Sequence, residues 1–491
     1  MAIHRFTRAV ADLPASSPKP GETKQRWIHR QFVEAIETGL LQPGDGVPST
    51  RTLAERWGTS RGVVELAFEQ LGREGYLDAM VGRGTQVSAL LPERFLKTRP
   101  LAPAPDRAAR EPAPIPPPGH AAVNPVRAGQ PFVARLPDVN TFDLAGWRAS
   151  VSRAARALDP ETLGDADPRG LPALRQEVCR HIALSRGVKC QPDQIMIVTG
   201  IRHAIDLCAQ AAVPVGGKVA LEDPGYAGAE QIFRLRRCQT VDVPLDRQGI
   251  DIDTLRRVRV DMAYVTPAHQ APTGVAMSPS RRAELLDWAQ ATGSWLLEDD
   301  YDSDFSYEMA PLPALKSQDH DDRVIFCGSF NKSMFPGLRI AYVVAPHALL
   351  PHLLQVRAAT GRSNPVLDQL ALADFMASES MLRQLRKARV AYKGRRDLIL
   401  QELMAVGFAP HAFEGLHAGF HFVLRLPPGT DEAALVLRVR EAGIEVQGIR
   451  SFWRGRTPMP GPALVIGYSA LTNAQARWSA KLLAAELASV L

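Results

Sequence analysis

Hydrophobic positions in the first ninety residues follow the spacing of three short helices and a hairpin. Between residues 23 and 39, the apolar side chains that share one helical face are Trp27, Ile28, Phe32, Ala35 and Ile36. A second helix is predicted over 49–57, and Ser60 is placed to cap a third. Two strand-like pieces, 76–81 and 85–89, follow and are joined through glycines. This order predicts a winged helix-turn-helix.

From about residue 124 the pattern changes to short apolar runs that alternate with amphipathic stretches. The apolar runs predict buried strands over 194–199, 218–221, 262–265, 294–297 and 323–327. The amphipathic stretches predict helices over 171–184, 201–212 and 280–291. Such alternation is typical of α/β proteins. After about Pro365 we expect a long basic helix and then a smaller α+β portion.

A stretch rich in proline, alanine and arginine separates the two patterns. It covers residues 91–123 and is densest at Pro-Ile-Pro-Pro-Pro-Gly, residues 114–119. Such a composition cannot form a core and favours extended conformations. We therefore predict an N-terminal extension (1–22), a head (23–90), this linker, and a body (124–491).

Composition excludes several classes of protein. The chain has 491 residues, too many for one small domain, and its 45% hydrophobic and 22% charged content is ordinary for a globular protein. No apolar run approaches the length of a membrane span. The five cysteines are scattered without metal-ligand spacing, which fits reduced thiols. We expect a cytoplasmic protein, and the net charge of +6 is compatible with a nucleic-acid partner.

Chemistry is concentrated after the apolar run 323–327, in Ser-Phe-Asn-Lys-Ser-Met-Phe-Pro-Gly-Leu-Arg (329–339). A lysine just past a buried strand is held in one place, and its aromatic neighbours would lower the local dielectric. Desolvation frees the amine of Lys332 as a nucleophile, which Schiff-base chemistry requires. Ser329 and Arg339 supply a hydroxyl and a permanent cation suited to a phosphate. The alternative is an exposed lysine after a core strand.

The 329–339 string resembles the cofactor-lysine segment of fold-type I pyridoxal phosphate aminotransferases, and more narrowly the MocR branch of the GntR regulators. Asn331 stands where that branch usually has serine. Further segments resemble the same family in the same order: Asp-Pro-Arg-Gly (167–170), Glu-Asp-Pro-Gly-Tyr (222–226), Thr-Pro-Ala-His-Gln-Ala-Pro-Thr-Gly (266–274) and Glu-Asp-Asp-Tyr-Asp-Ser-Asp-Phe (298–305).

The resemblance implies a role for several residues. Lys332 would bind the aldehyde of pyridoxal phosphate, Asp299 would hold the pyridine nitrogen, and Tyr301 would hydrogen-bond the 3′-oxygen. Tyr226 would lie against the ring, although ordinary packing is the alternative. We expect Asp302 and Asp304 to remain surface charges and His269 to be structural.

The head resembles the GntR DNA-binding domain from Pro-Gly-Asp (43–45) to Gly-Arg-Gly-Thr (82–85). The residues that this implies for DNA binding lie at helix starts and at the wing tip. Ser60 and Arg61 could reach base edges, while phosphates would be contacted by Thr50, Arg51, Arg83 and Gly84. The alternative is a small three-helix domain that binds nothing.

The sequence departs from the family around the amine-binding pocket. Many fold-type I enzymes hold the substrate carboxylate through an arginine before a terminal Gly-Phe or Gly-Tyr, but Val-Ile-Gly-Tyr (465–468) has none. Ala271 occupies a position where an aromatic residue or asparagine is common. Arg202 follows Gly200 where small hydroxyl residues are common. Other cations that could bind a carboxylate are Arg450, Arg454 and Arg456.

The resemblance implies a homodimeric, pyridoxal phosphate-dependent transcriptional regulator of double-stranded DNA. An amine, an amino acid or the cofactor itself would be the effector. The alternatives are a working aminotransferase that carries a DNA-binding head, and a cofactor-free DNA-binding protein with a degenerate body. A basic run between Arg383 and Arg396 could face DNA or the partner subunit, although such runs are usually a solvated helix face.

Overall fold

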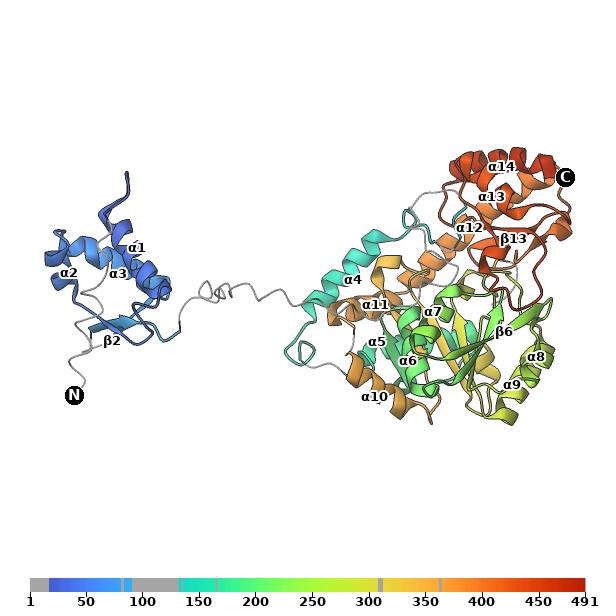
Figure 1. Ribbon diagram of the computed structural model, residues 1–491, viewed down its shortest axis with the longest axis horizontal. Coiled ribbons are helices and arrows are strands. Elements are labelled where there is room, and N and C mark those ends of the chain that lie inside the picture. The colour runs from blue at the N-terminus through green and yellow to red at the C-terminus, as the bar shows by residue number, and fades with distance from the viewer. Residues whose placement is uncertain are drawn as a thin grey trace, which may run out of the picture. The chain divides into compact units, whose positions relative to one another are not determined.

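The computed structural model describes residues 17–80, 84–90, 132–134, 136–164, 167–307, 312–361 and 364–490. The chain divides into two compact units, Met1–Pro114 and Ile115–Leu491, which are described separately (Figure 1). Among the helices of the described residues, none is both long enough and apolar enough to cross a bilayer.

The first unit is the predicted winged helix-turn-helix. Its helices are α1 (Lys24–Glu37), α2 (Thr50–Arg56) and α3 (Arg61–Arg73). Its antiparallel sheet has the order β1-β3-β2, with strands β1 (Gly46–Val47), β2 (Leu77–Met80) and β3 (Gly84–Val87). Ser49 caps α2 by accepting a hydrogen bond from the Thr52 amide. The predicted apolar positions form one buried core around Ile28 and Phe32, both fully buried.

The second unit is built on an eight-stranded sheet with the order β4-β11-β10-β9-β8-β5-β6-β7. Its strands are β4 (Ile195–Val198), β5 (Lys218–Asp223), β6 (Gln239–Asp246), β7 (Gly249–Ile250), β8 (Met262–Val265), β9 (Trp295–Asp300), β10 (Val324–Ser329) and β11 (Ala341–Val344). The pairs from β6 through β5, β8 and β9 to β10 are parallel, whereas β11 runs antiparallel between β10 and β4. Parallel strands need both faces covered, which explains their unbroken apolar runs.

Helices connect these strands and cover the sheet (Figure 1). They are α4 (Leu144–Arg156), α5 (Pro172–Arg186), α6 (Ile201–Ala212), α7 (Ala227–Leu235), α8 (Ile252–Arg256), α9 (Pro279–Thr292), α10 (Leu350–Thr360) and α11 (Val366–Ala377). The α/β architecture predicted from the sequence is confirmed. The strand predicted at 294–297 in fact reaches Asp300, so Asp299 lies within β9 and not in a loop after it.

The long basic helix α12 (Ser380–Ala405) leads to the smaller α+β portion. Its four-stranded antiparallel sheet has the order β12-β13-β15-β14, with strands β12 (Phe413–Glu414), β13 (His421–Arg425), β14 (Gln447–Gly448) and β15 (Ala463–Gly467). Helices α13 (Glu432–Glu441) and α14 (Asn473–Leu487) complete it. The segment between β12 and β13 reaches back to the chain that follows β9, where Ala418 forms an isolated bridge with Ser306.

Candidate cofactor site and DNA-binding surface

Two adjacent parallel strands, β9 and β10, bring the main site residues together. Cys327 of β10 lies opposite Asp299 of β9, so the carboxyl ends of both strands open at the same edge of the sheet. Lys332, three residues beyond the end of β10, has its Nζ 3.9 Å from the centroid of the Tyr301 ring. The same Nζ lies 5.0 Å from the ring of Phe420, which belongs to the smaller α+β portion. The lysine amine is therefore held between aromatic faces.

Asp299 is a buried carboxylate that is only half satisfied. Its Oδ2 accepts a hydrogen bond of 2.5 Å from the Tyr264 hydroxyl, whereas its Oδ1 is buried and has no hydrogen-bond partner among the described residues. Burial, offset in part by Tyr264 and Lys332, raises the pKa of Asp299 to about 7. An unpartnered buried acceptor is costly. The pyridine nitrogen of pyridoxal phosphate carries the kind of N–H that Oδ1 lacks, so this residue fits the cofactor.

Tyr301 belongs to a buried network with His269 and Asp302. His269 Nδ1 lies 3.1 Å from the Tyr301 hydroxyl and 2.9 Å from Asp302 Oδ2. His269 Nε2 lies 3.3 Å from the carbonyl oxygen of Gly415, so both ring nitrogens are engaged, as expected of a structural histidine. Burial opposes ionisation of Asp302, but His269 outweighs it and holds the pKa of that carboxyl below its usual value.

The expectation that Asp302 and Asp304 are surface charges is wrong. Asp302 is buried at 4% exposure, because the segment around Gly419 packs directly against its carboxylate. Asp304 accepts from His181 of α5 at 3.1 Å, and Arg389 of α12 donates to its carbonyl oxygen. Both carboxylates are therefore paired inside the body.

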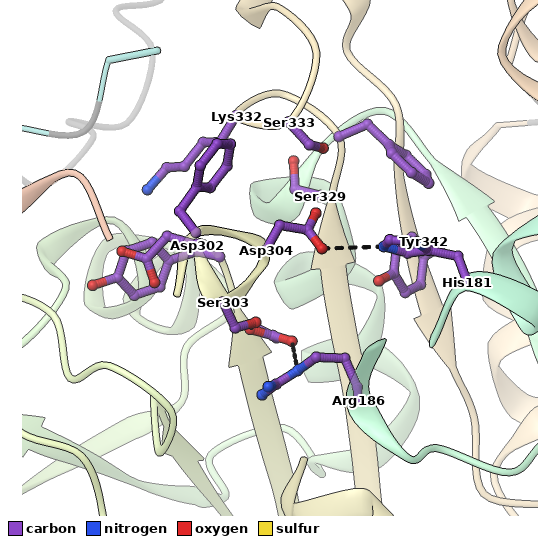
Figure 2. Close-up of a pocket in the computed structure, with 13 residues that line it drawn as sticks. His181, Arg186, Asp302, Ser303, Asp304, Ser329, Lys332, Ser333 and Tyr342 are labelled. Atoms are coloured by element: carbon purple, nitrogen blue, oxygen red, sulfur yellow. Dashed lines mark hydrogen bonds and ion pairs between the residues drawn. The ribbon is translucent and has the colours of Figure 1, made fainter. Parts of the chain in front are cut away.

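A small cavity lies beneath the lysine loop, and charged side chains surround it (Figure 2). Arg186 pairs with Asp300 at 2.6 Å, and both side chains are almost fully buried. Ser329, Lys332 and Ser333 line the same cavity from the end of β10 and the following loop. Breaking a buried ion pair is strongly destabilising, so this pair fixes the end of β9 to the end of α5.

The elements that could hold a phosphate meet at the N-terminus of α6. Gly200 has φ +123° there, and a side chain on it would come within 3.9 Å of Asn331 Nδ2. Ser329 Oγ accepts from the Asn331 amide at 3.2 Å. The Arg339 side chain is exposed, and no carboxylate of the described residues pairs with it. Helix N-termini with nearby hydroxyl and guanidinium groups bind phosphates well.

Tyr226 lies apart from the cavity beneath Lys332. It precedes α7 and lines a second, smaller cavity with Ala271 and His421. Its hydroxyl accepts from Arg202 Nε at 3.3 Å. Burial, together with the nearby Asp299 and Tyr226, raises the pKa of Tyr264 well above its usual value.

Sequence reasoning missed Tyr264 and His421. Tyr264 lies in β8, where it looks like an ordinary apolar strand residue, and only the pairing of β8 with β9 brings it to Asp299. His421 begins β13, more than eighty positions after Lys332, and its ring centroid lies 5.1 Å from that of His269. The feature of the sequence that could have pointed to His421 is its position, a histidine at the start of an apolar run.

In the head, the residues expected to bind DNA are accessible. Ser60 is the N-cap of α3, and the next residue, Arg61, has a 67% exposed side chain. Arg51 in the first turn of α2 is 81% exposed. Each arginine pairs with a glutamate one turn later on its own helix, Glu65 for Arg61 and Glu55 for Arg51.

Exposed ion pairs of this kind are weak, so both guanidinium groups can leave their glutamate partners and bind DNA phosphates instead. Thr50 is the first residue of α2. Gly84 begins β3 opposite Met80, with φ +86°. Arg83 lies outside the described residues.

The comparisons with known proteins agree with this architecture. Residues 25–87 match the gntR family of bacterial regulatory proteins, and residues 140–462 match class I and II aminotransferases. A GntR-type helix-turn-helix joined to an aminotransferase-type body therefore defines the class of protein.

Two relatives with this architecture are regulators by name. The chain is 31% identical over 379 residues to the probable rhizopine catabolism regulatory protein MocR of Rhizobium meliloti, covering 76% of each chain. It is 30% identical to the pyridoxine biosynthesis transcriptional regulator PdxR of Corynebacterium glutamicum, covering 96% of this chain and 97% of PdxR. The chain belongs to the MocR-type regulators of the GntR family.

Solved structures similar to the body are aminotransferases. A kynurenine aminotransferase of Pyrococcus horikoshii has a TM-score of 0.66 at 24% identity, covering 73% of this chain and 91% of that one. The α-aminoadipate aminotransferase LysN of Thermus thermophilus has a TM-score of 0.64 at 26% identity, covering 73% and 92%. The body thus has the fold-type I aminotransferase architecture.

Proposed function

We propose that this protein is a cytoplasmic, homodimeric transcriptional regulator that binds pyridoxal phosphate in its body and double-stranded DNA through its head. An amine effector, sensed at the cofactor, would alter DNA binding. The observation that carries the proposal is the unpartnered Oδ1 of Asp299, buried beside the amine of Lys332. A buried carboxylate oxygen for which the described residues supply no donor, at the carboxyl end of a central strand, is explained by a ligand that brings its own N–H.

The described residues suit distinct parts of the cofactor. Lys332 would hold the aldehyde carbon, Asp299 the ring nitrogen and Tyr301 the 3′-oxygen. When bound, pyridoxal phosphate supplies a ring that withdraws electrons from carbon attached to an amine nitrogen. The phosphate would lie between the N-terminus of α6, Ser329 and Arg339, and Tyr226 would cover the ring.

The head would read DNA with the start of α3. Arg61 and Ser60 are placed to reach base edges in the major groove, while Thr50, Arg51 and the wing residues Arg83 and Gly84 would contact phosphates. A dimer would present two such heads to repeated or palindromic sites. The head (23–90) and the body (124–491), joined by the linker, would then form the working regulator.

The visible absorption spectrum of the full chain tests the cofactor assignment. Wild type with added pyridoxal phosphate is expected to become yellow, and borohydride reduction should fix the cofactor to Lys332. Lys332→Ala should stay colourless, whereas Lys393→Ala, which removes an exposed lysine of α12, should behave as wild type. A wild-type protein that stays colourless with excess cofactor would contradict the proposal.

A second function, aminotransferase turnover, is favoured by the arrangement of Lys332, Asp299 and Tyr301 on a body similar to solved aminotransferases. It predicts conversion of a keto acid to an amino acid by the loaded protein. Ligand-dependent DNA binding without such conversion would favour the regulator.

A further inference from the structure

A second small cavity in the body is linked to the Lys332 amine through a chain of ring contacts. Its walls come from both parts of the body and are Ala134, Tyr226, Ala271, Pro272, His421, Phe452 and Val465. His421 connects the two places: its neighbour Phe420 contacts the lysine amine, and its own ring lies 5.1 Å from that of His269. His269 in turn contacts Tyr301, over whose ring Lys332 Nζ lies.

The described walls offer no permanent cation for an anion, and Tyr226 is their one side chain with a hydroxyl. Five of the seven side chains are aliphatic or phenyl groups, and none of the seven is cationic apart from a potential charge on His421. His421 Nε2 lies 3.0 Å from the carbonyl oxygen of Pro272, which can only accept, so Nε2 carries the proton. Burial and the neighbouring His269 lower the pKa of His421 to about 3, so the ring is neutral.

Neither nitrogen of His421 can therefore donate to a ligand. Nε2 already donates to Pro272, and Nδ1 carries only a lone pair, buried with no hydrogen-bond partner in the part of the chain that the structure describes. A carboxylate oxygen placed beside it would meet a second acceptor. Burial of a carboxylate there is unfavourable, because the carboxylate loses water and gains neither a donor from His421 nor a cation from the described walls.

Two arginines of the described residues lie near the cavity, and both already have hydrogen-bond partners. Arg454 forms a salt bridge of 2.6 Å with the buried Asp242 and donates to the carbonyl oxygen of Glu222. Arg202 donates to the Tyr226 hydroxyl from the first turn of α6, at the end of the site suited to phosphate. Ala271, which stands where an aromatic residue or asparagine is common, forms part of the apolar wall, as does Val465 from the string that lacks the family's arginine.

We propose that this cavity receives a small uncharged substituent of the effector, and that the effector is a primary amine without an α-carboxylate. The proposal rests on the proposed function, since it assumes that an amine is bound at the cofactor beside Lys332. It narrows the effector class from amines and amino acids to simple amines with a methyl-sized or similarly small apolar group at this position. A hydroxyl group on the effector could also bind in the cavity by donating a hydrogen bond to Nδ1 of His421, whereas an anionic group has no proton to donate.

A matched pair of ligands tests the inference. Isopropylamine and alanine differ only by a methyl group in place of the carboxylate. Each is titrated into the full chain loaded with pyridoxal phosphate, and the change in the visible band is followed, with concentrations expressed as unprotonated amine. Isopropylamine is expected to reach half-saturation at a concentration at least about tenfold lower than either enantiomer of alanine, in line with the unfavourable burial of an unpaired carboxylate.

Two substitutions at one position serve as variant and control. Ala271→Asn introduces amide donors and is expected to shift the preference toward alanine. Ala271→Leu adds a side chain of similar size without a donor and should weaken both ligands together.

Each contrary result is distinct. Equal or tighter binding of alanine than of isopropylamine would overturn the inference. The clearest form of that result would be alanine binding that the substitution Arg202→Ala abolishes, because Arg202 would then be holding the carboxylate. A normal cofactor band that neither ligand changes would overturn it as well. Failure to form the band at all would overturn the proposed function, and this inference with it.

Discussion

Replacing Asp299 by asparagine should make the cofactor-free protein more stable while destroying its affinity for pyridoxal phosphate. The folded state raises the pKa of this carboxyl from 3.8 to about 7, chiefly through burial. Each pKa unit corresponds to about 1.4 kcal/mol, so ionised Asp299 costs the folded chain roughly 4 kcal/mol. Asparagine keeps an oxygen for the Tyr264 hydroxyl and carries no charge, so we expect a gain of about 2–4 kcal/mol at pH 8.

The pH dependence follows from the direction of the shift. Because the folded-state pKa is raised, the folded protein holds the proton of Asp299 over a pH range in which the unfolded chain has lost it. The penalty is absent below about pH 4, grows between pH 4 and 7, and is complete above pH 7. The advantage of Asp299→Asn should therefore be large at pH 8 and small at pH 5.

The assay is urea unfolding of the cofactor-free full chain, followed through the transition of the body at both pH values. Asp300→Asn is the matched control on the same strand. Asp300 pairs with buried Arg186 at 2.6 Å, so its removal strands a cation and should cost about 3–5 kcal/mol. Added cofactor should stabilise wild type and not Asp299→Asn. A destabilised Asp299→Asn protein, or a gain that does not change with pH, would refute the reasoning.

Three further outcomes are expected. Arg51→Ala should weaken binding to a fixed DNA duplex. It should also reduce the slope of the logarithm of the binding constant against the logarithm of salt concentration by about 1, because one phosphate contact is lost. Arg56→Ala, at the far end of α2, is the control and should leave the slope unchanged. Phe32→Ala removes a fully buried ring from the head and should lower the free energy of unfolding of the head by about 3–5 kcal/mol. DNA binding should be abolished, whereas the cofactor band of the body should be intact. Loss of both would show that the two units do not fold independently. Arg395→Ala leaves Asp138, the partner of Arg395 at 2.7 Å, buried without that cation. The free energy of unfolding of the body, measured with denaturant, should fall by about 3–5 kcal/mol. A fall of less than about 1 kcal/mol would mean that the pair contributes little.

The sequence predicted the architecture because its signals are local. Apolar runs of strand length, helix caps such as Ser49, and the proline-rich linker each depend on neighbouring positions only. Parallel strands end at a common edge of the sheet, so Lys332 and Asp299, each at the end of an apolar run, could be expected to meet there. The structure brings them and Tyr301 together, and their roles toward the cofactor stay predictions.

What the tertiary structure alone decided lies at contacts between distant segments. Asp302 and Asp304 look solvated in an acidic string, yet the segment around Gly419 and helices α5 and α12 pack over them and supply their partners. The Tyr264 hydroxyl reaches Asp299 only through the order of strands in the sheet. Likewise, the apolar cavity between Ala271 and Val465 exists because two parts of the body close on one another. Burial and the choice of hydrogen-bond partner depend on which surfaces meet, and a local pattern of residues does not contain that information.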